Sequence, residues 1–294
     1  MLVEMHDPSS SCPCVVVGID GSRAAMQATM WSVDEAIDRD IPLHLLYAID
    51  SDSNDPDDVA AAAATADRTV HNVLMEIQSE GKPVKVESEV VHARPIPALL
   101  EASRSAAMVC VGSIGFKHAT RGRIGSTAST VATFAHCPVA IVPRTTSDIT
   151  HADNLILAVI DGSPGDDRVL ERAVEEARLR NAVLRVFTTP QAQHGERNSI
   201  EALPERTKRI ERDIEHRLTH WRRNHPHLDV RLVSDHADLL NYLEYLQRKS
   251  APPQLVIADS SRPGPADALL SPAGRATLEA TACTLMLCDR RWWL

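Results

Sequence analysis

The chain consists of two similar halves, and this repetition constrains its fold more than any other feature of the sequence. The segment GIDGS, which ends at Ser22, returns as VIDGS, which ends at Ser163, an offset of 141 residues. Near the two ends, AHCPVAIVP and TACTLMLCD correspond with an offset of 146 residues. Because each repeat is long enough for an ordinary domain, we expect two tandem domains, 1–147 and 148–294, with the boundary in the polar stretch RTTSDITHAD.

Each half alternates short apolar segments with longer amphipathic ones. In the first half the apolar segments are CVVVGI, LHLLYAI, VKVESEVV, AMVCVG and PVAIVP. Asp20 and Ser22 are predicted to cap the helix that follows the first of them. The pattern predicts an α/β fold of two tandem Rossmann-like domains, each with a five-stranded, mostly parallel sheet and helices on both faces. In such sheets ligands bind beyond the C-terminal ends of the strands.

Charge and hydropathy exclude several classes of function. The net charge of −9 argues against general nucleic-acid binding, which needs a basic face. No apolar run approaches the length of a membrane span, and the N-terminal segment MLVEMHDPSSSCPC lacks the features of a signal peptide. We therefore expect a cytoplasmic protein without membrane partners. Four of the six cysteines lie in or beside strand-like runs and are expected to be reduced, buried thiols.

A glycine-rich segment, VGSIGFKHATRGRIGS, follows the fourth predicted strand and holds four of the twelve glycines. Neither the Walker A pattern nor the dinucleotide fingerprint occurs. The spacing is instead Gly112-x-x-Gly115, nine residues, then Gly125-Ser126. Glycine allows a phosphate to approach backbone N–H groups, and Gly125, Ser126 and Thr127 begin a predicted helix whose N-terminus favours an anion.

This spacing resembles the nucleotide-binding signature of the universal stress protein family. GIDGS, HCPVAIVP and the duplication extend the resemblance over essentially the whole chain. The resemblance implies that Gly112, Gly115, Gly125 and Ser126 cradle the phosphates of ATP, with or without Mg²⁺. It further implies contacts to the ribose and adenine from Asp20 and the backbone of Ile19, and a base pocket that is lined by Ala48 and Val111.

Two alternatives remain open at the loop. Asp20 and Ser126 can be helix caps and the glycines ordinary turns, although this does not explain the fixed spacing. The cations Lys117, Arg121 and Arg123 can reach the phosphates or can form the solvated face of the loop. The family often has a second hydroxyl two residues after Ser126, where this chain has Ala128.

Other patterns give no catalytic or metal site. The acidic stretch DSDSNDPDD departs from a calcium loop at its sixth and twelfth positions, and His216 and His220 are predicted to lie on a solvated helix face. No paired carboxylates or base accompany the glycine loop. We therefore expect an ATP-binding, nucleotide-dependent stress sensor or regulator and no efficient enzyme. The alternatives are a slow ATP-hydrolysing enzyme and an interaction module with a vestigial nucleotide site.

The second half is expected to lack an ATP site. Alignment on the first-half loop places Asp259 at Gly112, Arg262 at Gly115, and Pro272-Ala273 opposite Gly125-Ser126. A carboxylate repels phosphate, and proline removes an N–H donor. The sequence thus predicts one ATP per chain.

We also expect a homodimer. Family members commonly associate through the last strand of the domain, which corresponds here to PVAIVP or TLMLCD. An exposed apolar edge strand favours such pairing.

Overall fold

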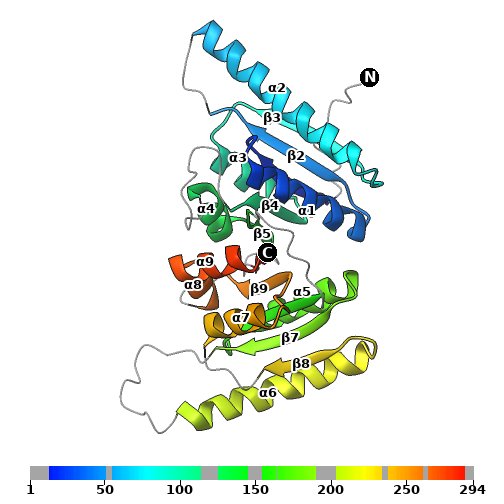
Figure 1. Ribbon diagram of the computed structural model, residues 1–294, viewed down its shortest axis with the longest axis vertical. Helices are drawn as coiled ribbons and strands as arrows, with labels where there is room; N and C mark the ends of the chain where they lie inside the picture. Colours follow the sequence, from blue (N-terminus) through cyan, green and yellow to red (C-terminus); the bar gives the residue numbers. More distant parts are fainter. Residues whose placement is uncertain are drawn as a thin grey trace.

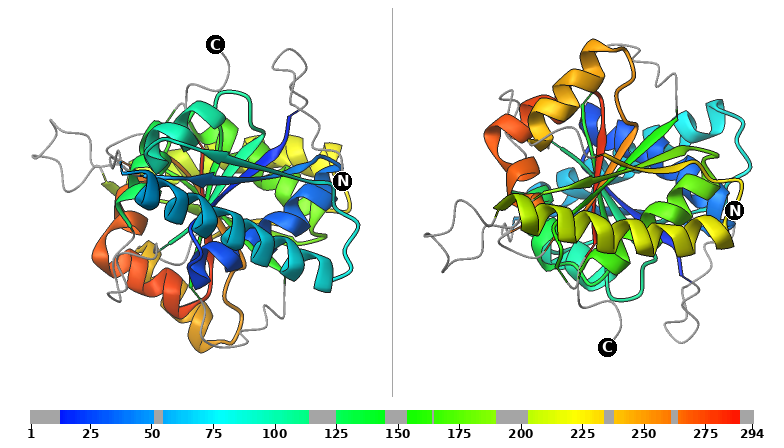
Figure 2. Two further views of the ribbon diagram at one scale, coloured as in Figure 1. Left: turned by 90° about the horizontal axis from the view of Figure 1, so that it is seen from above. Right: turned by 90° about the horizontal axis from the view of Figure 1, so that it is seen from below.

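The computed structural model (Figure 1) describes residues 13–50, 55–113, 125–144, 154–163, 165–189, 203–233, 238–260 and 264–288, with side chains of the helix at 203–224 described from residue 212. Its strands form one ten-stranded sheet in the order β3-β2-β1-β4-β5-β10-β9-β6-β7-β8. Helices lie on both faces, and the strands fan out along the length of the sheet (Figure 2). The tandem α/β fold that the sequence predicts is confirmed.

The described residues of the first half form five parallel strands and four helices. They are, in chain order, β1 (Val15–Ile19), α1 (Arg23–Arg39), β2 (Leu43–Ala48), α2 (Pro56–Ser79), β3 (Val86–Val91), α3 (Pro95–Ala102), β4 (Met108–Gly112), α4 (Ser126–Phe134) and β5 (Val139–Val142). All five strands lie within the predicted segments. For β1, β4 and β5 the signal is a short continuous apolar run, which is typical of a buried parallel strand. The edge strand β3 instead mixes apolar and charged residues and is not buried.

The second half repeats this arrangement and adds one short helix. It comprises β6 (Leu155–Ile160), α5 (Asp166–Leu179), β7 (Val183–Thr188), α6 (Leu203–Asn224), β8 (Val230–Val233), α7 (Leu239–Arg248), β9 (Leu255–Asp259), α8 (Pro265–Leu270), α9 (Pro272–Ala280) and β10 (Thr284–Cys288). Its strand order 8-7-6-9-10 mirrors the order 3-2-1-4-5 of the first half.

Two apolar layers cover the sheet, one on each face. On one face α1, α2, α5 and α6 contribute buried residues such as Val33 and Val169 to a continuous core. On the other face α3, α4, α7, α8 and α9 contribute residues such as Leu99 and Leu278. No helix in the described part of the chain is long and apolar enough to cross a membrane.

The two halves join through β5 and β10, which are the only antiparallel neighbours among the described strands. Leu285 pairs with Ile141 and Leu287 with Val139. The expectation that either strand offers an exposed edge to a second copy is therefore wrong, because each is the partner of the other. Homodimerisation stays a prediction, and it requires a different surface.

Candidate functional site

The C-terminal ends of β1, β2 and β4 bring several predicted site residues together. Ile19 pairs with Tyr47, so Ala48 follows directly on the neighbouring strand. On the other side of β1, Val17 pairs with Cys110, so Gly112 lies level with Ile19 two residues further along. The three strand ends thus form one edge of the sheet, where ligands of such folds bind.

The turn between β1 and α1 presents polar groups at this edge. The carboxylate of Asp20 accepts a hydrogen bond from the Ser22 amide at 2.9 Å, and the hydroxyl of Ser22 accepts from the Ala25 amide at 3.1 Å. Ser22 is thus the N-cap of α1, as predicted, whereas exposed Asp20 orders the turn before it. Gly21 has φ +78°, a conformation that favours glycine, and its amide has no acceptor among the described residues.

The two ends of the glycine loop meet at its base. The amide of Gly125 donates to the carbonyl of Ser113 at 2.9 Å, and the amide of Ser113 donates to Val142 at the end of β5 at 2.8 Å. The loop therefore leaves β4 and returns to the same place at the N-terminus of α4. Ser113 was missed as a site residue, because its contribution is made by backbone groups that carry no side-chain signal.

The N-terminus of α4 has no side-chain cap within the described residues. Gly125 is its N-cap, Ser126 is exposed and Thr127 is half-buried. Ser126 is thus the first residue of the helix and not its cap. Helix N–H groups that no side chain occupies, combined with the helix dipole, favour an anion at this position. Ala128, where the family often has a hydroxyl, is buried in the core.

Three of the predicted residues have packing roles that account for their identity without a ligand. A Cβ on Gly112 would lie 2.6 Å from the backbone carbonyl carbon of Ala24, so glycine is needed there for α1 to pack on β4. Val111 is 4% exposed and belongs to the core, as does Ile19 at 4%. The side chain of Ile19 is therefore taken up by the core, and contact of a ligand with its backbone stays a prediction.

Part of the predicted site lies outside the described residues. This applies to Gly115 and to the loop cations Lys117, Arg121 and Arg123, and in the second half to Arg262.

The corresponding edge of the second half is filled by its own carboxylates. Asp166 is 1% exposed, and its two oxygens accept from the amides of Asp161 at 3.2 Å and Gly162 at 2.9 Å. In the first half Ala25 occupies the place of Asp166 and leaves the equivalent turn without this carboxylate. Burial, followed by repulsion from Asp161, raises the pKa of Asp166 to about 6.

Asp259, which takes the place of Gly112, packs against the start of α5. It is 4% exposed, and a Cβ on Gly165 would lie 1.6 Å from its Oδ2. Gly165 in turn corresponds to Ala24. Glycine and the larger residue have thus exchanged positions between the halves. In the first half the strand carries Gly112 and the helix start carries Ala24, whereas in the second half the strand carries Asp259 and the residue before the helix is Gly165.

The helix that corresponds to α4 is capped by its own side chain. The hydroxyl of Ser271 accepts from the Gly274 amide at 3.1 Å and donates to the carbonyl of Ala268 at 2.6 Å. Pro272 is the first residue of α9 and has no N–H. The structure aligns Ser271-Pro272 with Gly125-Ser126, so the predicted alignment was wrong by one residue. The helix start follows the offset of 146 residues shared by the C-terminal segments.

The remaining candidates provide no further site within the described ranges. No group of three or more histidine, cysteine or acidic side chains there could hold a metal ion. His220 contacts the amide of Asn224 at 2.9 Å on α6. Cys110, Cys137, Cys283 and Cys288 are buried, as predicted, and burial raises the pKa of each thiol, to about 12 for Cys137 and Cys288.

Comparison with known proteins gives a consistent result over the whole chain. The sequence profile of the Universal stress protein family matches residues 14–143 and again residues 154–288. Universal stress protein Rv2028c of Mycobacterium tuberculosis is 36% identical over 294 residues, which cover 98% of this chain and 99% of the relative. Universal stress protein Rv3134c of the same species is 38% identical over 263 residues, 87% of this chain and 91% of the relative.

A solved structure shares the two-domain arrangement. The crystal structure of a universal stress protein from Archaeoglobus fulgidus superposes with a TM-score of 0.65 over 94% of this chain and 96% of that chain. Since the two sequences are 14% identical, this likeness concerns the fold alone.

Proposed function

The chain belongs to the universal stress protein family, and we propose that it binds one ATP per chain in its first half and acts as a nucleotide-dependent stress sensor or regulator. The phosphates would lie at the N-terminus of α4. The adenosine would lie against the ends of β1 and β2, near Asp20 and Ala48.

The contrast between the two helix N-termini carries this proposal. The N-terminus of α4 has no side-chain cap in the described part of the chain, whereas Ser271 and Pro272 close that of α9. Uncapped helix N–H groups next to a glycine-rich loop fit a polyphosphate. The amide of Gly21 is a second donor on the same edge, while the amide of Gly162 is already taken by Asp166.

The arrangement of this site favours nucleotide binding over efficient hydrolysis. Hydrolysis of a phosphoanhydride needs a group that orients the attacking water beside the terminal phosphate. Asp20 holds the amide of Ser22 on the β1–α1 turn, at the end of the site assigned to the adenosine, so it is poorly placed for that task. Slow hydrolysis remains the alternative, and a vestigial site in an interaction module is the second one.

The nucleotide that accompanies the protein through purification tests the proposal. Protein that has been purified without added nucleotide is denatured, and the released small molecules are identified by mass spectrometry. We expect ATP at up to one equivalent per chain, and weaker retention of AMP and cyclic AMP in competition. Protein that retains none, and that ATP fails to stabilise against heat, would leave the interaction-module alternative.

A further inference from the structure

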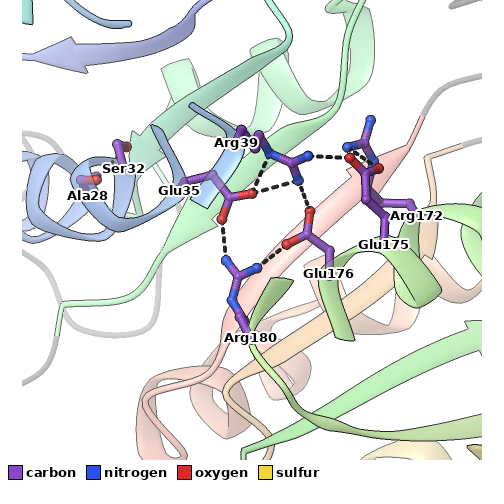
Figure 3. Close-up of polar contacts among 8 residues, drawn as sticks. All are labelled: Ala28, Ser32, Glu35, Arg39, Arg172, Glu175, Glu176 and Arg180. Atoms are coloured by element: carbon purple, nitrogen blue, oxygen red, sulfur yellow. Dashed lines mark hydrogen bonds and ion pairs between the residues drawn. The ribbon is translucent and has the colours of Figure 1, made fainter. Parts of the chain in front are cut away.

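A buried ring of four charged residues joins the halves across the β5–β10 junction. Glu35 and Arg39 come from α1, and Glu176 and Arg180 come from the corresponding positions of α5 (Figure 3). Each carboxylate accepts from both guanidinium groups: Arg39 donates to Glu35 at 2.8 Å and to Glu176, and Arg180 donates to both glutamates. The offset of 141 residues relates the two pairs, so one helical motif meets its own copy.

The ring is shielded from solvent. The side chains of Glu35 and Glu176 are 0% exposed, and those of Arg39 and Arg180 are 9% and 12% exposed. The guanidinium of Arg180 also lies 5.3 Å from the centre of the Trp31 ring. Such burial is costly for charges: burial, followed by the neighbouring charge of Glu35, raises the pKa of Glu176 above its ordinary value.

Stability alone does not explain why this ring is present. Apolar residues of similar volume often stabilise an interior as well as a buried ion-pair cluster does, since no charge then has to be desolvated. The apolar side chains of β5 and β10 make no directional contact that would favour one register of the two strands over another. Val139, Ala140 and Ile141 pair with Leu287, Met286 and Leu285, and a slip of two residues would keep the same faces buried.

We propose that the ring is a pairing lock between α1 and α5 that fixes the register of β5 on β10 and makes the two halves unfold as one unit. The bidentate geometry of arginine suits this role, because a displaced helix would leave buried charges without their partners. A functional consequence, which rests on the proposed ATP site, is that a ligand bound at the first half also stabilises the second.

Charge exchange tests the lock without changing the composition of the ring. The double variant Glu35→Arg with Arg39→Glu keeps opposite charges one turn apart on α1, but it sets like charges against Arg180 and Glu176. The quadruple variant adds Glu176→Arg and Arg180→Glu and restores opposite charges at every contact within the ring. Because Arg39 also donates to Glu175, the substitution Glu175→Gln accompanies both the double and the quadruple variant, so that the carboxylate introduced at position 39 meets no second one. Exchange of the exposed pair Glu101 and Arg104, which are 2.9 Å apart, is the surface control.

Calorimetric unfolding and amide hydrogen exchange provide the measurements. For the wild type, the control and the quadruple variant we expect a single transition with joint protection of the β5 and β10 amides. For the double variant we expect two transitions, or failure to fold, and at least tenfold faster exchange at the junction. In a variant that folds but unfolds in two transitions, ATP would stabilise only the transition of the first half. ATP binding itself is measured separately. If the protein does not bind ATP, only the predicted effect of ATP on the transitions is lost, and the test of the lock is unaffected.

Two outcomes would overturn the lock. One is a double variant that unfolds in a single transition with wild-type exchange at the junction. The other is a quadruple variant as defective as the double variant, since the defect would then reflect local packing and not the pairing of charges.

Discussion

At the scale of single residues, the two halves differ in what their strand ends carry. Gly125 gives the N-terminus of α4 no side-chain cap, and no other described residue supplies one, whereas the hydroxyl of Ser271 accepts a hydrogen bond from the first turn of α9. The first turn of α1 has a small residue, Ala25, where the first turn of α5 has the carboxylate of Asp166. A few substitutions thus separate strand ends whose described amides lack side-chain acceptors from strand ends where the protein's own side chains accept from them.

Replacement of the α4 cap should move stability and nucleotide affinity in opposite directions. Gly125 has φ −57° and ψ 151°, a conformation that aspartate adopts readily as an N-cap. For Gly125→Asp we expect unfolding free energy that is unchanged or higher by a few tenths of a kcal/mol, because the carboxylate caps the helix. ATP affinity should fall at least tenfold, since the same carboxylate occupies and repels the phosphate position.

Thermal unfolding and calorimetric titration give the two values for this variant. Ser271→Gly is the matched control in the second half: it should cost a few tenths of a kcal/mol of stability and leave ATP affinity unchanged. Unchanged affinity in folded Gly125→Asp would remove the phosphate site from α4.

Asp166 should give the protein a characteristic pH dependence. Its pKa is raised from 3.8 to about 6 in the folded state, mainly by burial. Folding therefore favours the protonated form, so the contribution of this group is fully present below pH 4 and is lost as the pH rises through 6. Relative to the wild type, Asp166→Asn should gain up to on the order of 3 kcal/mol between pH 4 and pH 6. Denaturant titrations across this range measure the difference, and a constant difference would contradict the assignment.

At the scale of the elements, most of the fold could be predicted because its signals are local. Apolar runs locate the strands, and Ser22 or Gly125 mark where helices begin. The packing reason for Gly112 could not be predicted, since it depends on the approach of α1 to β4. Asp166 was missed because an acidic residue in the first turn of a helix is ordinary in sequence, and only the tertiary structure shows that it is buried.

The exchange of glycine between strand and helix predicts that a substitution in β9 rescues a destabilising substitution at the start of α5. Gly165→Ala alone should destabilise the protein by about 1–3 kcal/mol, because the added methyl overlaps the buried Asp259 side chain. Addition of Asp259→Gly recreates the arrangement of Ala24 and Gly112 and should recover most of the loss. Denaturant unfolding measures both variants. A double variant no more stable than Gly165→Ala would show that the two positions are not in contact.

At the scale of the whole molecule, the repeat could be read from the sequence, but the way in which its copies meet could not. The offset of 141 residues identifies Glu35 and Glu176 as equivalent, yet nothing local indicates that the two helices face each other. Apolar β5 and β10 favour pairing with a strand of any chain, and the structure places each against the other. The result is one continuous sheet in which the two halves are related by an approximate twofold axis at the β5–β10 junction but differ at the C-terminal ends of their strands.

The central claim is that only the first half of the chain binds ATP. Calorimetric titration of nucleotide-free protein with ATP measures the number of sites directly. We predict one site per chain, because α4 and the β1–α1 turn offer donors that have no side-chain acceptor among the described residues. In the second half Asp166, Asp259 and Ser271 fill the corresponding positions. Two equivalent sites per chain, or no binding, would contradict this account.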